Sequence, residues 1–305
     1  MPALVRDTNV SVFLPVFLIT SAFVTQLQAA PIVALFDPLT LQPASALAVP
    51  AVPNSLAFGN NSLYAASSAG LARYTPAGSL VALLSPPGLF LFSNVTFDTY
   101  VYAAIELSGT RVISRIIDFD NSSFMQQPFV PLTAMPLALA RASQQTFAAF
   151  PHELAQYDAA GQFTAFFSPA TAFLFHPLAS YQSQLYAAIT SEGATRLSAV
   201  LQVADASLTE IVLASLPGVP TALAAGAGGL YAAFSGGVLH RYGFDGTLLA
   251  THTDPTLSFT AAAIGPDFLY VAADSTAGAE VPEPTSLTMA CSMLLLFALL
   301  RARHS

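Results

Sequence analysis

The chain has 305 residues, of which 54% are hydrophobic and 9% are charged, and its formal net charge is −8. That charged fraction is far below the roughly 25% of ordinary soluble domains, so the composition argues against disorder, a coiled coil and charge-driven nucleic-acid binding. Lysine is absent, and one or two domains fit this length.

Residues 1–30 are predicted to be a secretory signal peptide. Arg6 and the amino terminus supply positive charge, and a mostly apolar run of 15 residues follows at 10–24. This run is too short to span a bilayer of about 30 Å comfortably, and the small residues Ala29 and Ala30 come after it. We expect export through the secretion translocon and cleavage by signal peptidase near Ala29 or Ala30. An uncleaved N-terminal anchor is the alternative.

Residues 31–275 contain six similar units. A motif of the Leu-Tyr-Ala-Ala type recurs with its aromatic residue at Tyr64, Tyr102, Phe147, Tyr186, Tyr231 and Tyr270. The spacings of 38, 45, 39, 45 and 39 residues average 206/5, or about 41. Such a period is typical of the four-stranded blades of a β-propeller. The sequence therefore predicts an all-β, six-bladed propeller with these aromatic residues in its core.

A longer period groups the units into three pairs. The odd units continue with a further strand pair, in which a Gly follows a Tyr by four residues: Tyr74 and Gly78, Tyr157 and Gly161, Tyr242 and Gly246. The tyrosines are 83 and 85 residues apart. Each Gly is expected in a hairpin turn that needs a positive φ.

The sixth unit has too little chain for a whole blade. It supplies two strands before residue 275, whereas residues 32–37 and 46–49 precede the first unit without a blade of their own. These segments are similar to the outer strands of the even units, such as residues 112–118. We predict that they complete the sixth blade, which closes the ring and hides two sheet edges.

The first strand of each unit is expected to line a central channel. The predicted segments are 55–58, 92–97, 137–140, 173–178, 221–225 and 257–262, and none contains an acidic residue. The channel-lining candidates are Asn54, Asn94 and His176. For Asn94, a strand-end role that satisfies backbone groups is the competing interpretation.

The body resembles six-bladed propellers of the NHL and gluconolactonase type, through the repeat and the pattern of Tyr64, Arg73, Tyr74 and Gly78. Gluconolactonase-like propellers bind a divalent cation through carboxylate and Asn oxygens, and the expected channel strands lack the carboxylates. No hydrolase or phosphate-binding motif occurs, and the single cysteine, Cys291, lies outside the body. We expect no catalytic residue, metal or cofactor.

Residues 276–305 are expected to be a linker and a sorting signal. A polar motif at 281–286, which begins with Val281, Pro282, Glu283 and Pro284, precedes an apolar segment at 287–300 and a basic tail at 301–305. Arg301 and Arg303 fit a stop signal at the cytoplasmic end of a membrane helix. This order resembles the PEP-CTERM sorting signal, which implies cleavage by exosortase near the motif. An ordinary tail anchor is the alternative.

Together these features predict an exported, non-catalytic propeller of the cell surface or exopolysaccharide matrix, a location that the PEP-CTERM resemblance implies. The chain would be anchored transiently in the inner membrane, and its candidate partners are exopolysaccharide or another surface protein. The acidic body, with six Arg against 15 carboxylates in residues 31–282, disfavours nucleic acid.

Two other classes of function remain open from the sequence. One is a propeller hydrolase or lyase, such as a lactonase, with its site in the channel mouth. The other is an outer-membrane protein built of strands, which fits less well because such a protein needs a polar lumen and this chain has few charges.

Overall fold

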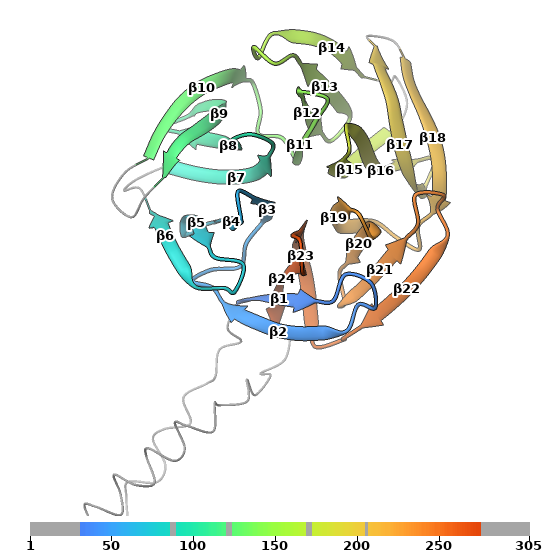
Figure 1. The fold of residues 1–305 in the computed structure, drawn as a ribbon. Coiled ribbons are helices and arrows are strands. Elements are labelled where there is room, and N and C mark those ends of the chain that lie inside the picture. The colour runs from blue at the N-terminus through green and yellow to red at the C-terminus, as the bar shows by residue number, and fades with distance from the viewer. Residues whose placement is uncertain (1–30, 86–89, 120–123, 169–172, 205–206, 276–305) are drawn as a thin grey trace, which may run out of the picture. The chain divides into compact units, whose positions relative to one another are not determined.

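Six four-stranded antiparallel sheets form a ring around a central axis (Figure 1). The computed structural model describes residues 31–85, 90–119, 124–168, 173–204 and 207–275. The predicted six-bladed propeller is therefore confirmed. The predicted signal peptide and the predicted sorting signal, with Val281 to Pro284, Arg301 and Arg303, lie outside the described residues and stay predictions.

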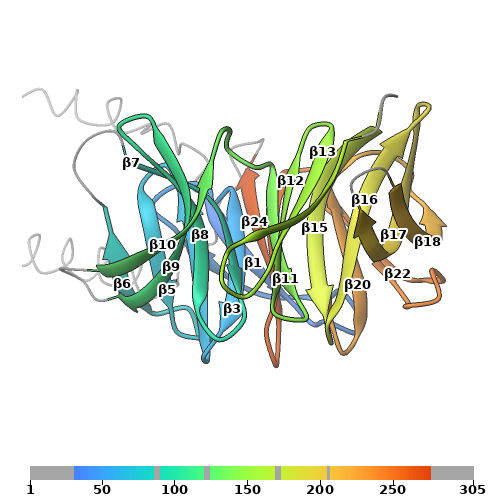
Figure 2. The same cartoon turned by 90° about the horizontal axis from the view of Figure 1, so that it is seen from above.

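Blades 1 to 5 each take four consecutive strands, with the first strand innermost and the fourth at the rim (Figures 1 and 2). Blade 1 is β3 (Ser55–Gly59), β4 (Ser62–Ser67), β5 (Gly70–Tyr74) and β6 (Leu80–Leu84), and blade 2 is β7 (Phe90–Phe97), β8 (Val101–Leu107), β9 (Thr110–Phe119) and β10 (Phe124–Leu132). Blade 3 is β11 (Ala138–Ala142), β12 (Gln145–Phe150), β13 (Glu153–Tyr157) and β14 (Phe163–Phe167). Blade 4 is β15 (Phe173–Tyr181), β16 (Gln184–Ser191), β17 (Ala194–Ala204) and β18 (Ser207–Ser215), and blade 5 is β19 (Pro220–Gly226), β20 (Gly229–Phe234), β21 (Val238–Tyr242) and β22 (Leu248–Thr253).

Blade 6 joins the two ends of the propeller. Its inner strands are β23 (Leu257–Ile264) and β24 (Leu269–Ser275), and its outer strands are β1 (Ile32–Phe36) and β2 (Pro43–Ala48). The antiparallel pairing of β1 with β24 sets Ile32 opposite Ala273 and Phe36 opposite Leu269. The prediction that the N-terminal strands complete the last blade is confirmed.

The hydrophobic core is divided among the seams between neighbouring blades. In the described part of the chain, buried side chains form six clusters, one at each seam. Along β4, Leu63 and Ala65 pack toward blade 6, whereas Tyr64 and Ala66 pack toward blade 2. Because successive side chains of a strand point to opposite faces, one short motif fills two seams.

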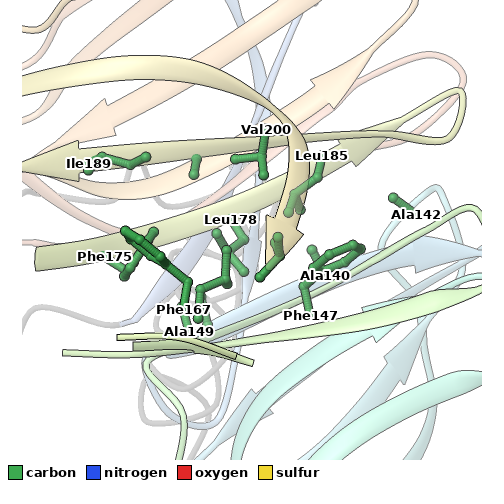
Figure 3. Packing of buried hydrophobic residues seen from close by; sticks show 14 of the residues in the cluster. Ala140, Ala142, Phe147, Ala149, Phe167, Phe175, Leu178, Leu185, Ile189 and Val200 are labelled. Carbon is green, nitrogen blue, oxygen red and sulfur yellow. The ribbon is translucent and has the colours of Figure 1, made fainter. Parts of the chain in front are cut away.

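All six repeat aromatics are buried, none more than 7% exposed, as predicted. Figure 3 shows such a residue, Phe147, in the seam between blades 3 and 4, where Phe167 and Phe175 also pack. Two of the tyrosines also form a hydrogen bond with the next blade. The hydroxyl of Tyr231 donates to Pro38 O at 2.7 Å, and that of Tyr270 donates to Pro76 O at 3.0 Å. These two tyrosines therefore also tie their blades to a turn of the next blade.

The turn glycines predicted in the odd blades do have positive φ, at 90° for Gly78, 80° for Gly161 and 85° for Gly246. These glycines also lie close to the preceding blade. A Cβ on Gly161 would stand 2.4 Å from Phe129 O, and one on Gly246 would stand 1.9 Å from Leu213 O. Glycine is thus required both by the turn and by the close approach of two blades.

We predict that Gly246→Ala destabilises the protein by about 1–3 kcal/mol more than Gly109→Ala does. Both glycines have a φ of 85°, but a Cβ on Gly109 would meet nothing within 4 Å, so only Gly246→Ala adds a clash with the backbone. Both variants share a cost of about 1–2 kcal/mol for the left-handed conformation. Denaturant unfolding would measure the difference, and equal losses would contradict the close blade contact.

Candidate functional site

The inner strands enclose a central cavity of about 460 Å³. This volume lies within the range of about 300–1,000 Å³ of ligand pockets. All the described side chains that line the cavity are uncharged, and its polar members include Asn54, Ser55, Asn94, Tyr181, Thr221 and Thr260. The channel is therefore large enough for a small ligand but offers it no ionic partner.

In two inner strands, the residues that line the cavity lie further along the chain than predicted. Residues 173–178 and 257–262 were expected, whereas residues 177–181 of blade 4 and 260–266 of blade 6 line the cavity. In both of these strands, a bulge interrupts the pairing with the neighbouring strand. It lies between Phe175 and Leu178 in β15 and between Phe259 and Ala261 in β23. A bulge redirects the strand, so only the part around and after it follows the channel.

The two predicted asparagines both line the cavity. Asn54 is exposed, and Asn94 is half-buried. The Nδ2 group of Asn94 donates to Pro136 O at 2.8 Å, across the seam between blades 2 and 3. Asn94 therefore satisfies a backbone carbonyl, which was the competing interpretation of this residue.

His176 is half-buried and is not among the described residues that line the cavity. Its Nε2 atom lies 2.9 Å from Thr190 Oγ1, which lies 2.8 Å from Thr195 Oγ1. Burial lowers the pKa of His176 below its usual value. The imidazole is thus neutral near pH 7 and belongs to a hydroxyl network within blade 4.

Other channel residues join neighbouring blades in the same way as Asn94. Ser55 Oγ accepts a hydrogen bond from Val95 N at 3.0 Å, which ties blade 1 to blade 2. Thr260 Oγ1 donates to Pro53 O at 2.7 Å, which ties blade 6 to blade 1. The sequence did not indicate these contacts: Thr221 and Thr260 each precede the aromatic residue of their unit by ten positions, but Thr221 donates to Ala233 O within its own blade.

The described lining supports little acid–base or metal chemistry. It contains no carboxylate, imidazole or thiol, which are the groups that exchange protons near neutral pH or hold divalent cations. Across the described residues, no group of three or more His, Cys, Asp or Glu side chains is placed to hold a metal ion. Nor does any helix in those residues have the length and apolar character to cross a membrane.

Comparison with known proteins supports the fold alone. No protein-family model and no curated protein sequence matches the chain. Among solved structures, a PQQ-bound aldose sugar dehydrogenase from Streptomyces coelicolor has 13% identity over 81% of this chain and 98% of its own, with a TM-score of 0.53. A gluconolactonase from Xanthomonas campestris has 13% identity over 81% and 97%, with a TM-score of 0.51.

A third similar structure is a β-propeller domain. The Cps50 (Swd1) β-propeller domain from Myceliophteria thermophila has 13% identity over 76% of this chain and 83% of its own, with a TM-score of 0.50. A sugar dehydrogenase, a gluconolactonase and this propeller domain are thus about equally similar to the chain. The likeness therefore identifies the architecture and carries no activity over to this protein.

We predict that Asn94→Ala lowers the free energy of unfolding by about 1–3 kcal/mol, because the Pro136 carbonyl loses its hydrogen bond in a half-buried seam. The exposed Asn54 lines the same cavity and provides the matched control, and Asn54→Ala should change stability by less than about 0.5 kcal/mol. Chemical denaturation of both variants measures this. Equal effects would show that Asn94 does not tie the blades together.

Proposed function

We propose that this protein is an exported, non-catalytic β-propeller that acts as a binding module of the cell surface or exopolysaccharide matrix. The observation that carries the proposal is the uncharged lining of the channel. A propeller hydrolase or lyase needs ionisable groups or a metal at that place. Here the polar groups Ser55, Asn94 and Thr260 are engaged in contacts between blades.

The proposed location rests on the two ends of the chain. The apolar run at 10–24 supports export, and the motif at 281–286, the apolar segment at 287–300 and the basic tail support sorting by exosortase. The body suits a compartment outside the cytoplasm because its strands close on themselves and need no disulfide, the one cysteine being Cys291.

We predict that the exported protein contains no stoichiometric metal and hydrolyses neither lactones nor phosphoesters above the level of a heat-denatured sample. The reason is that the described channel lining has no general base and no carboxylate ligand. Elemental analysis and a lactone and phosphoester screen on the purified protein would test this. Turnover that is lost on chelation would overturn the proposal in favour of a propeller hydrolase or lyase.

We predict that changing Pro282, Glu283 and Pro284 together to Ala leaves full-length protein in the inner membrane. Without its recognition motif, the apolar segment at 287–300 would remain as an anchor held by Arg301 and Arg303. Fractionation and immunoblotting of cells that contain exosortase would show this, with Thr285→Ala/Ser286→Ala as the control that keeps Pro282, Glu283 and Pro284. Normal processing of the triple variant would refute the role of the motif.

A further inference from the structure

A second cavity, of about 530 Å³, opens at the turns between the first and second strands of blades 2, 3 and 4. The turns of this type lie at one face of the ring, which Figure 2 shows edge-on. Three residues, Phe97, Ser180 and Tyr181, line both this cavity and the central channel. The cavity is therefore a groove that extends from the channel mouth across three blades, and we call it the turn groove.

The turn groove is built around an ion pair that joins two blades. Arg141, whose side chain is 4% exposed, lies 3.3 Å from the carboxylate of Asp98, which is 42% exposed. The guanidinium also donates to Thr146 Oγ1 at 2.7 Å and to Gln144 O at 3.0 Å, and it lies 4.1 Å from the ring centroid of Tyr102. Arg141 is thus fully engaged and buried, and it holds a charge-balanced carboxylate at the surface of the groove.

The two turns opposite Asp98 carry polar side chains on strained backbone. Ser143 and Gln144 have φ values of 50° and 65°, and Gln182 and Ser183 have φ values of 46° and 70°. Glycine adopts this conformation at lower cost, and these positions carry hydroxyl and amide side chains instead. The Oγ atom of Ser143 donates to Ser183 O at 3.1 Å, so the two turns are held together.

The chemistry of the turn groove selects a neutral ligand with many hydroxyl groups. Asp98 accepts hydrogen bonds, whereas Gln144 and Gln182 both donate and accept them, and Gln182 Nε2 already donates to Tyr181 Oη at 3.2 Å. Arg141 balances the charge of the Asp98 carboxylate, so the ion pair does not attract a cation. The chain has a net charge of −8, which repels an anionic polymer. At one end, Phe97 and Tyr181 provide aromatic surface for the apolar face of a sugar ring.

We propose that the turn groove binds a neutral polysaccharide chain, with Asp98, Gln144 and Gln182 as its hydrogen-bonding residues. This inference rests on the proposed function and names a ligand class and a binding site for it. The binding site does not include the channel polar groups that tie the blades together. A groove volume of about 530 Å³ is within the usual range of ligand sites.

The decisive variant is Gln144→Gly/Gln182→Gly, because binding and stability should then change in different directions. Removing the amides deletes ligand contacts, whereas glycine relieves the positive φ at both positions. The matched control is Asn60→Gly/Asn61→Gly, in the corresponding turn of blade 1, where the φ values are 47° and 52° and the side chains do not line the groove.

The experiment is affinity electrophoresis of the exported protein in gels that contain dextran, hydroxyethylcellulose or galactomannan, with anionic alginate as the comparison. We expect at least one neutral polymer to retard the wild type and the blade 1 control, and alginate not to. For the groove variant we expect about tenfold weaker binding, since two hydrogen-bonding side chains are lost, with a thermal midpoint no lower than that of the wild type.

Three results would overturn the groove proposal: no retardation by any neutral polymer, equal retardation by alginate, or unchanged binding by the groove variant. Unchanged binding would move the saccharide site elsewhere and leave the proposed matrix function standing. A lactone or phosphoester activity would instead overturn the proposed function, whatever the electrophoresis shows. The two proposals can therefore fail separately.

Discussion

The pairing of β1 with β24 is the contact on which the rest of the propeller depends. Five blades are built from consecutive strands, but the sixth exists only when residues 32–48 return to the end of the ring. A continuous ladder from Ile32 opposite Ala273 to Phe36 opposite Leu269 makes this closure. Arg241 of blade 5 reinforces it by donating to Leu39 O, in the turn between β1 and β2, while its Nε donates to Gly228 O within blade 5. Every sheet has a neighbouring sheet on each side, so both of its faces are covered.

This closed arrangement explains the composition of the chain. Each middle strand is buried on both faces, so Leu-Tyr-Ala-Ala reads as a continuous apolar run rather than an alternation of apolar and polar residues. The alanines allow the blades to approach, and the large aromatic residues fill the wider parts of each seam. The apolar character of the middle strands thus results from six interfaces within one molecule.

Polar groups have different tasks in different parts of the ring. In the channel, Asn94, Ser55 and Thr260 hold adjacent blades together, and a side chain with this task has little freedom to bind a ligand. At the turns, side chains that join blades can stay accessible. Asp98 pairs with the buried Arg141 of the next blade, yet 42% of the Asp98 side chain remains exposed.

The sequence by itself determined the number of blades, the buried aromatic residues, the turn glycines and the closure by the N-terminal strands. These follow from local patterns that recur in each unit, such as Tyr157 and Gly161, and from the strand count at the two ends. Only the tertiary structure decided which residues of different units meet. Asp98 and Arg141 are 43 positions apart and belong to different blades, and Asn94 reaches a carbonyl 42 positions away. Such contacts depend on how one blade is set against the next, and on bulges that shift the channel strands, neither of which a repeat period specifies.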